Sequence, residues 1–421
     1  TMLFMRLLQR LFYSSTARQS VIFYVGNFVI NLGNYAFHFL LLKLISPSEY
    51  GEFASYLSLL YLLTIPSSAI SIMVTKQVAD YVSQGQNDKL NSLFGYLVGK
   101  SWMFSLVLFG LLLLGNPLLV LMFDVERGAI YILAISIFPT IVSSIVNAYI
   151  LGQQRFKTYI VVGIVGMMVK LITAYLLIIL GYRVMGAVLS IFVAMIVAMI
   201  GAIVVIKSTV WPAISSKTKF RLRSLASYAF VYSSASLALI TVDVLLVRYF
   251  FSPLDSGLYA SIMTLSKTIY FGTLPLTLLV IPIISRRANL GLSTGKIFGG
   301  IWLVVAGIGG MGILMFGMFP TLLIRILAGE AYLAGQSLLV PAGITMLLFS
   351  LNVMVVNYFM ALSLHRIIWG LLLGAILQPI VIGFFHGSIL GVVYINMMIQ
   401  VGLILGNGSW GWWLMKRTKG I

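Results

Sequence analysis

Long apolar runs separated by short polar segments dominate the chain, and several of these runs hold about 20 residues with few or no charges. A helix of that length crosses the hydrocarbon core of a bilayer. The pattern predicts an all-α polytopic membrane protein with twelve transmembrane helices. The first six are expected at about 20–45, 52–75, 92–115, 128–151, 158–180 and 184–206. The second six are expected at about 225–250, 257–284, 297–318, 337–362, 367–385 and 388–414.

A short motif occurs twice, once in each half of the chain. The segment LLKLISPSEYGEFAS at 41–55 aligns, after one gap, with LVRYFFSPLDSGLYAS at 246–261. Each copy ends a span with a cation, Lys43 or Arg248, before a Pro–acid–Gly turn. Because six spans per half is an even number, the halves are expected to be parallel repeats. The expected parts are an amphipathic segment at 1–19, a first lobe at 20–206, a linker at 207–223, a second lobe at 224–415 and a basic tail at 416–421.

Charge along the chain orients the predicted spans. Most of the 27 Lys and Arg residues fall on the side that holds the N-terminus, and both termini are expected to be cytoplasmic for that reason. The cations on the other side are Lys43, Arg127, Arg183, Arg248 and Arg325. The net charge of +18 does not indicate nucleic-acid binding, because the cations form short clusters between spans. With 61% hydrophobic residues, 9% charged residues and no cysteine, a soluble domain and a disulfide framework are excluded.

Four polar side chains interrupt the first span on one side of the helix. Asn27, Asn31, Asn34 and His38 fall within about 60° of one another at 100° per residue. Facing lipid, these groups would lack hydrogen-bond partners, which is energetically costly. Two interpretations fit the stripe, namely hydrogen bonds to other helices or the wall of a polar cavity, and four positions in register favour the cavity.

Span seven carries a matching stripe of Tyr232, Ser236 and Asp243. Asp243 is the only acidic residue expected deep within a span, and a carboxylate at the centre of a membrane helix costs at least about 2.5 kcal/mol. It therefore needs a partner or a role. The alternatives are an ion pair with Arg248 or a lysine, and an ion-coupling site that takes up a proton or binds a cation such as Na⁺.

Three lysines are expected inside spans, against this single aspartate. Lys170 lies near the middle of span five, Lys267 lies about ten residues into span eight, and Lys100 could also reach the interface from span three. Such an excess of positive charge is hard to keep in a low dielectric without an anion. An anionic cargo is therefore favoured, with phosphate as the first candidate, and Lys43 and Arg248 could extend the cationic lining. Span twelve adds three amides on one face, which could line the cavity or could equally serve as contacts between helices: Asn396, Gln400 and Asn407.

Motifs of catalysis and of ATP binding are missing from the sequence. It contains no His-Glu-x-x-His and no Gly-x-x-x-x-Gly-Lys-Ser/Thr, and its three histidines are far apart. An enzyme is therefore not expected, and no cofactor or metal is predicted. Transport would have to run on an ion gradient or on the concentration difference of the substrate.

Four segments carry a resemblance to a known family: the first span with SPSEYGEFAS, NAYILGQQRFK (147–157), DVLLVRYFFSPLDSGLYA (243–260) and LPLTLLVIPIISR (274–286). In these segments and in the twelve-span plan, the chain resembles the Wzx-type polysaccharide flippases of the multidrug/oligosaccharidyl-lipid/polysaccharide (MOP) superfamily. The resemblance implies two six-helix lobes in a MATE-like V around a central cavity that opens alternately to each side. The implied cargo is a polyprenyl diphosphate with a short O-antigen or capsule sugar repeat, moved to the periplasmic leaflet of the bacterial inner membrane.

The resemblance also implies roles for the polar residues within the spans. Related flippases hold the pyrophosphate in a cationic cavity, and the cations available here are Lys170, Lys267, Lys100, Lys43 and Arg248. The residues expected to line the sugar part of the cavity are Asn27, Asn31, Asn34, His38, Tyr232 and Ser236. We expect a functional monomer, with a polysaccharide polymerase and a chain-length regulator of the same pathway as candidate partners.

Three other functions are weighed against the flippase. A cation-coupled multidrug exporter of the same fold would need acids to dominate its cavity, which is the opposite of the charge found here. A polymerase or ligase for the lipid-linked sugar would usually display a larger outer loop. A scaffold without transport activity would tolerate neutralisation of the lysines inside the spans.

Overall fold

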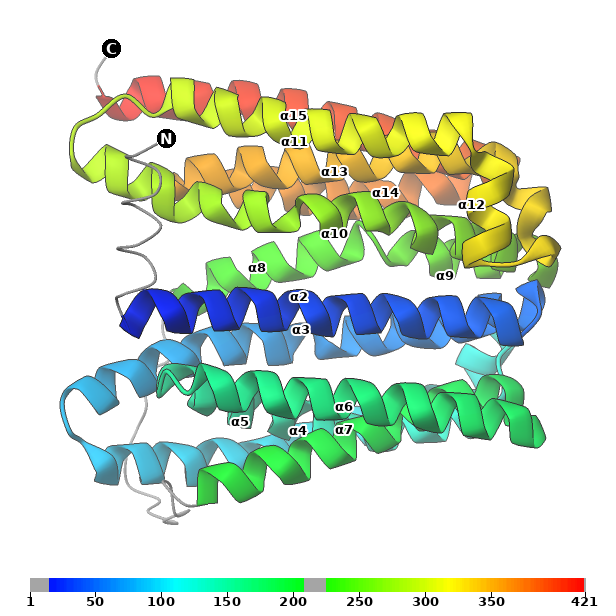
Figure 1. Ribbon diagram of the computed structural model, residues 1–421, viewed down its shortest axis with the longest axis horizontal. Coiled ribbons are helices and arrows are strands. Elements are labelled where there is room, and N and C mark those ends of the chain that lie inside the picture. Colours follow the sequence, from blue (N-terminus) through cyan, green and yellow to red (C-terminus); the bar gives the residue numbers. More distant parts are fainter. Residues whose placement is uncertain (1–14, 208–224, 420–421) are drawn as a thin grey trace. The chain divides into compact units, whose positions relative to one another are not determined.

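The computed structural model describes residues 15–207 and 225–419, and within these ranges every regular element is a helix. Most of the predicted amphipathic segment at 1–19, nearly all of the linker at 207–223 and the last two residues of the tail lie outside the described residues. Within each of the two units described below, Figure 1 shows long, roughly parallel helices, most of them joined by short turns.

Eleven stretches of the described chain are long and apolar enough to cross a membrane. One of them, Phe156–Ile206, is 51 residues long and contains two predicted spans. These are α6 (Phe156–Leu177) and α7 (Arg183–Lys207), which pack against each other on either side of the short element Ile178–Tyr182. Gly181 breaks the helical path there with φ 94°, a conformation that glycine adopts without steric cost. The chain is a multi-pass membrane protein.

The chain divides into two compact units, each described separately below. Unit 1 comprises residues 1–44, 63–121 and 125–227, and unit 2 comprises 45–62, 122–124 and 228–421. Two segments that the predicted boundaries place in the first lobe, 45–62 and 122–124, therefore belong to unit 2.

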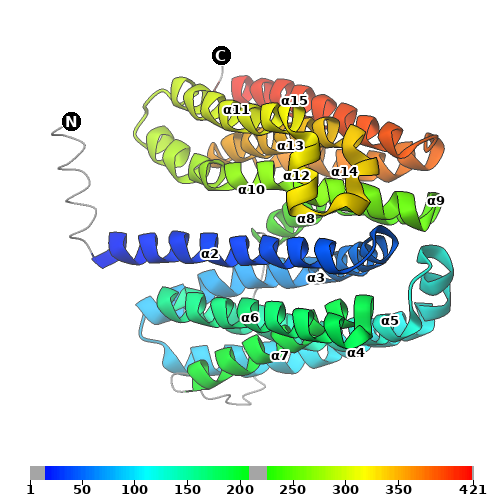
Figure 2. The ribbon, with the colours of Figure 1, turned by 45° about the vertical axis from the view of Figure 1, so that its right-hand side comes forward.

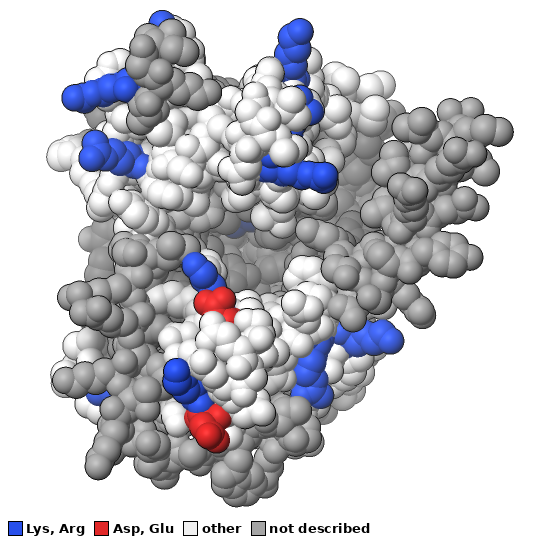
Figure 3. Space-filling view, turned by 90° about the vertical axis from the view of Figure 1, so that its left-hand side faces the viewer, with Lys and Arg blue, Asp and Glu red and all other residues white. Residues whose placement is uncertain are grey.

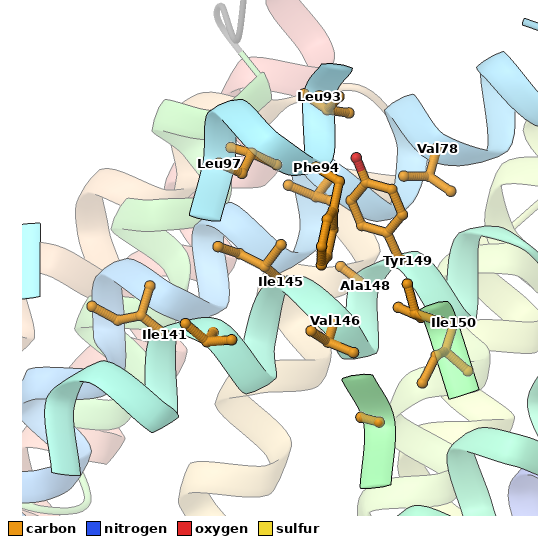
Figure 4. Packing of buried hydrophobic residues seen from close by; sticks show 14 of the residues in the cluster. Val78, Leu93, Phe94, Leu97, Ile141, Ile145, Val146, Ala148, Tyr149 and Ile150 are labelled. Carbon is orange, nitrogen blue, oxygen red and sulfur yellow. The ribbon is translucent and has the colours of Figure 1, made fainter. Parts of the chain in front are cut away.

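Unit 1 is built around α5 (Arg127–Gly152), one of the most buried spanning helices. Its core also draws on α3 (Pro47–Ser83) and α4 (Asn87–Phe123). Tyr149 lies at the centre of this cluster with its ring edge-on to Phe94 at 5.1 Å, and its hydroxyl donates to the Leu90 carbonyl at 3.0 Å (Figure 4). The phenol thus fills the core while its polar atom is satisfied by a neighbouring helix.

Helix α2 (Ser15–Leu44) packs closely on α6 through glycines. A side chain at Gly26 or Gly33 would collide with Ile160 or Met167 of α6, and one at Gly163 would collide with Ile30. Small residues at such an interface let two membrane helices approach closely. This approach brings the polar side of α2 to the middle of α6.

In unit 2 the central helix is α13 (Gln336–Ala361), which packs on α10 (Pro253–Asn289), α11 (Gly295–Met318) and α15 (Ile389–Lys419) (Figure 2). The remaining elements are α8 (Leu225–Ala238), α9 (Val242–Phe250), α12 (Pro320–Leu327), α14 (Ile368–Phe384) and the short turns at Glu330–Gly335 and His365–Ile367. The predicted seventh span is therefore two helices, because residues 239–241 interrupt it between α8 and α9.

The repeated motif forms matching helix starts within unit 2. Ser252 caps α10, with its hydroxyl accepting from the Asp255 backbone N–H at 3.1 Å and donating to the Asp255 carboxylate at 2.7 Å. Ser46 makes the same two contacts with Glu49 at the start of α3, at 3.4 and 2.8 Å. The glycines of the two copies lie against each other, since a Cβ at Gly51 would come within 2.9 Å of the Gly257 backbone. The two copies of the motif therefore meet backbone to backbone.

Candidate substrate and coupling sites

Lys170 of α6 is the cation best placed for a substrate role in unit 1. Its side chain is half-buried, its ammonium donates to Asn34 Oδ1 at 2.5 Å, and it lies 4.5 Å from the centre of the Phe37 ring. All nine acids fall within the described ranges, and none of them forms an ion pair with Lys170. An amide oxygen and an aromatic face solvate the ammonium but leave its charge uncompensated.

The structure separates the members of the predicted stripe on α2. Asn34 contacts Lys170, whereas the Asn27 amide donates to the Phe23 carbonyl of its own helix at 2.8 Å. Asn31 is half-buried, and the His38 ring is edge-on to Phe37 at 5.7 Å. A short amide side chain can donate a hydrogen bond to the backbone carbonyl one turn earlier in its own helix. A shared position on one helix face therefore does not identify the partner of each amide.

Asp243 is fully buried in the first turn of α9, at the centre of a polar network in unit 2. Its Oδ2 accepts from the Tyr259 hydroxyl at 2.6 Å and from the Asn396 amide at 3.0 Å. Gln378 extends the network by donating to Asn396 Oδ1 at 2.8 Å and to the Leu239 carbonyl at 3.1 Å. Four elements thus converge on one carboxylate: α9, α10, α14 and α15.

The interruption of span seven shapes this network. Residues 239–241 leave the helical path, so the Leu239 carbonyl is free to accept from Gln378. The new N-terminus of α9 points backbone N–H groups toward Asp243, which favours negative charge at that position. Lys267 of α10 acts on the same carboxylate electrostatically, but no ion pair joins the two in the described part of unit 2.

Arg248 does not pair with Asp243, which corrects one of the two alternatives for that aspartate. Its guanidinium is buried, donates to the Phe123 and Asp124 carbonyls at 2.8 and 2.7 Å, and lies 3.3 Å from the Asp124 carboxylate. These carbonyls lie at the C-terminal end of helix α4, where they lack partners within the helix. A cation there satisfies them and is itself stabilised by the negative end of the helix dipole. These contacts give Arg248 a structural role at the end of α4, and its place in a pyrophosphate site stays a prediction.

The other predicted residues are distributed over both units. Lys100 is exposed and borders an apolar pocket with Ile70 and Leu97, and Lys43 is exposed in the last turn of α2. In unit 2 the Tyr232 hydroxyl donates to Asn357 Oδ1 at 3.1 Å, and Ser236 lies half-buried one turn along α8.

No protein-family model and no curated protein matches this sequence. Solved structures do match over almost its whole length. An inward-facing multidrug resistance MATE family transporter of the MOP superfamily matches with a TM-score of 0.80 at 10% identity, over 92% of this chain and 96% of the other. The lipid II flippase MurJ in an inward closed conformation matches with a TM-score of 0.74 at 13% identity, over 92% and 86%.

A third similar structure is a MOP superfamily transporter from Pyrococcus furiosus, described as having a binding pocket whose reverse polarity suggests a different function. Its TM-score is 0.58 at 12% identity, and the match covers 94% of each chain. The chain has the fold of MOP superfamily transporters. Identities this low establish the fold alone.

Sequence reasoning missed two members of the Asp243 network within this MOP fold. Tyr259 carried a signal, because it aligns with Phe53 in the first copy of the repeat and adds only a hydroxyl, which is the group that reaches Asp243. Gln378 gave no comparable signal. Of the three amides on α15, Asn396 joins the network, whereas Gln400 and Asn407 bond to Asn352 of α13 and hold two helices together.

Proposed function

We propose that this protein is a flippase that moves a polyprenyl-diphosphate-linked oligosaccharide across the membrane. The observation that carries the proposal is Lys170, a half-buried ammonium held by an amide and an aromatic ring with no carboxylate partner. A cation in this setting attracts a phosphate anion and repels a cationic drug. The fold supports the same proposal, since structures of this fold include a lipid II flippase.

The remaining polar groups fit the proposal as follows. Lys267 would add to the cationic lining of the second lobe, while Asn31 and Tyr232 would meet sugar hydroxyls through amide and phenol groups. The substrate would move from the cytoplasmic to the periplasmic leaflet by alternating access between the lobes. Asp243 would couple this motion to a gradient, by taking up a proton or by binding Na⁺ next to Asn396 and Tyr259.

A cation-coupled multidrug exporter is the second candidate function. The Asp243 side chain favours an exporter, because it is a fully buried carboxylate in the membrane part of unit 2. Such a group could bind a cation that is either the transported substrate or the coupling ion. A MATE transporter is also among the similar structures. Unit 1, in contrast, offers a cation and no acid within its predicted spans.

Flipping in proteoliposomes tests the proposal. Purified protein would be offered a short-chain polyprenyl-diphosphate oligosaccharide, and leaflet exposure would be scored with a membrane-impermeant sugar-oxidising reagent. We expect wild type to flip the substrate and Lys170→Ala to slow flipping at least tenfold, because a charge-assisted contact to phosphate is worth about 1.5–3 kcal/mol. Lys170→Arg should retain part of the activity. Lys157→Ala removes an exposed lysine from the same helix and serves as the matched control.

Equal flipping by wild type and Lys170→Ala would remove Lys170 from the binding site but leave the flippase proposal standing. No flipping by wild type, together with transport of a cationic dye that depends on Asp243, would replace the flippase with the exporter. A size-exclusion profile like that of wild type would show that a variant's loss of activity does not come from misfolding.

A further inference from the structure

A polar pocket opens at the end of unit 2 that the charge pattern predicts to be cytoplasmic. Its volume is about 540 Å³. It lies between the start of α8, the turn after α13 and the end of α15, with the lining residues Tyr228, Ser363, Leu364, His365, Arg366, Leu414 and Arg417. None of these residues belongs to the Asp243 network or to the predicted substrate sites.

The turn after α13 places two basic side chains at this pocket. The helix ends where the Leu364 N–H donates to the Phe359 carbonyl at 3.0 Å, and Ser363 takes φ 64°. Glycine usually fills that left-handed position at a helix end, so a serine there keeps a hydroxyl at the rim of the pocket at a cost in backbone strain. His365 and Arg366 follow directly, and the His365 ring stacks on Tyr228 at 5.4 Å.

The pocket carries positive charge without a carboxylate to balance it. Arg366 and Arg417 are exposed, and neither forms an ion pair with a described acid. The three acids that follow Tyr228 in the chain are engaged elsewhere: Asp243 in its network, Asp255 with Ser252, and Glu330 with Arg325. Figure 3 looks onto this end of the helices and shows more Lys and Arg side chains than Asp and Glu side chains on that face.

The neighbouring surface has the character of a membrane interface. Trp412 and Trp413 are both about half exposed on α15, and the Lys416 ammonium and the Arg417 guanidinium lie over their rings at 4.0 and 5.4 Å. Indole rings with adjacent cations are typical of the headgroup region. The buried Leu414 side chain gives the pocket an apolar wall beside the arginines.

We propose that this pocket binds the phosphate group of an anionic membrane-lipid headgroup. A planar guanidinium donates two parallel hydrogen bonds to phosphate oxygens, and the Tyr228 and Ser363 hydroxyls can complete the shell. The same chemistry suits free inorganic phosphate, but the tryptophans and the leucine wall favour a ligand anchored in the bilayer. The proposal goes beyond transport and does not depend on the flippase function.

Binding to purified protein in detergent tests the site. Three probes would be compared by native mass spectrometry and by the shift in melting temperature: short-chain phosphatidylglycerol, phosphatidylcholine with the same chains, and sodium phosphate. We expect phosphatidylglycerol to bind wild type and to bind Arg366→Gln/Arg417→Gln at least tenfold more weakly. The control is Arg286→Gln/Lys296→Gln, which removes two exposed cations from the same end of unit 2 but outside the pocket.

Each alternative outcome overturns the proposal in a definite way. An equal loss of phosphatidylglycerol binding in the control pair would mean that net charge, and not the pocket, attracts the lipid. If sodium phosphate binds and phosphatidylglycerol does not, the ligand of the pocket is a free anion and not a lipid headgroup. Equal binding of phosphatidylcholine and phosphatidylglycerol would remove the preference for anionic lipid. If the double variant does not stay monodisperse, each single arginine variant should weaken binding about threefold, and no weakening in either would overturn the site.

Discussion

At the scale of single residues, Asp243 has the most demanding environment in the chain. Its carboxylate is fully buried, and the Tyr259 hydroxyl is its shortest hydrogen bond at 2.6 Å. Tyr259→Phe keeps the ring in the core but removes the hydroxyl that donates to Asp243 and accepts from the Asn396 amide. We expect the free energy of unfolding to fall by about 1–3 kcal/mol, measured by denaturation in mixed micelles.

A double-mutant cycle separates this contact from general effects on packing. Tyr259→Phe combined with Asp243→Asn should show a coupling energy of at least about 0.5 kcal/mol, because the two side chains share one hydrogen bond. Tyr232→Phe is the matched control, since its hydroxyl bonds to Asn357 and not to Asp243. Additive effects of Tyr259→Phe and Asp243→Asn would contradict the network.

The charged members of the two sites could be predicted from sequence, and most of their partners could not. Lys170 and Asp243 stand out because a charge within an apolar run is costly and therefore conspicuous. Gln378 and Tyr259 come from distant parts of the chain, and only tertiary packing brings them to Asp243. The contacts of Arg248 could not be predicted either, because its partners, the terminal carbonyls of α4, are backbone groups and leave no mark in the sequence.

At the scale of helices, the contact between the two copies of the repeat depends on glycine. A Cβ at Gly257 would collide with the carbonyl group of Pro47, and this backbone cannot move aside without shifting the start of α3. Gly257→Ala should therefore lower the free energy of unfolding by about 1–3 kcal/mol, the usual cost of overpacking. A thermal melt of the purified protein followed by tryptophan fluorescence would measure the change.

Gly272 is the matched control on the same helix, because a Cβ there would meet no atom within 4 Å. Gly272→Ala should leave stability unchanged or raise it by up to about 1 kcal/mol, as alanine is the better helix former. Equal destabilisation by the two alanine variants would show that the close approach at Gly257 does not limit packing.

Most of the helices could be predicted from hydropathy, and the interruptions among them only in part. Gly181 marks the turn between α6 and α7, where a glycine can take the required positive φ. The break at 239–241 lies in the sequence LIT, which contains neither proline nor glycine. What stabilises it is the Gln378 amide on the Leu239 carbonyl, a contact that local sequence does not reveal.

At the scale of the whole molecule, the uneven distribution of Lys and Arg determines the expected orientation in the membrane. Cations near the ends of spans keep those ends in the cytoplasm during insertion. The turns after α3 and after α10 should then be cytoplasmic, and those before α5 and α15 should be periplasmic. The proposed lipid site and the proposed direction of flipping both depend on this orientation.

The natural absence of cysteine makes this orientation directly measurable, because a single introduced thiol is the only one that a reagent can label. Ser83→Cys and Ser293→Cys lie in turns on the basic side, whereas Arg127→Cys and Ser388→Cys lie on the other, and all four positions are exposed. In intact cells a membrane-impermeant maleimide should label positions 127 and 388 only, and permeabilised cells should show labelling at all four. The reverse pattern would place Arg366 and Arg417 on the outer face, so the flipping direction and the leaflet of the lipid site would both be reversed.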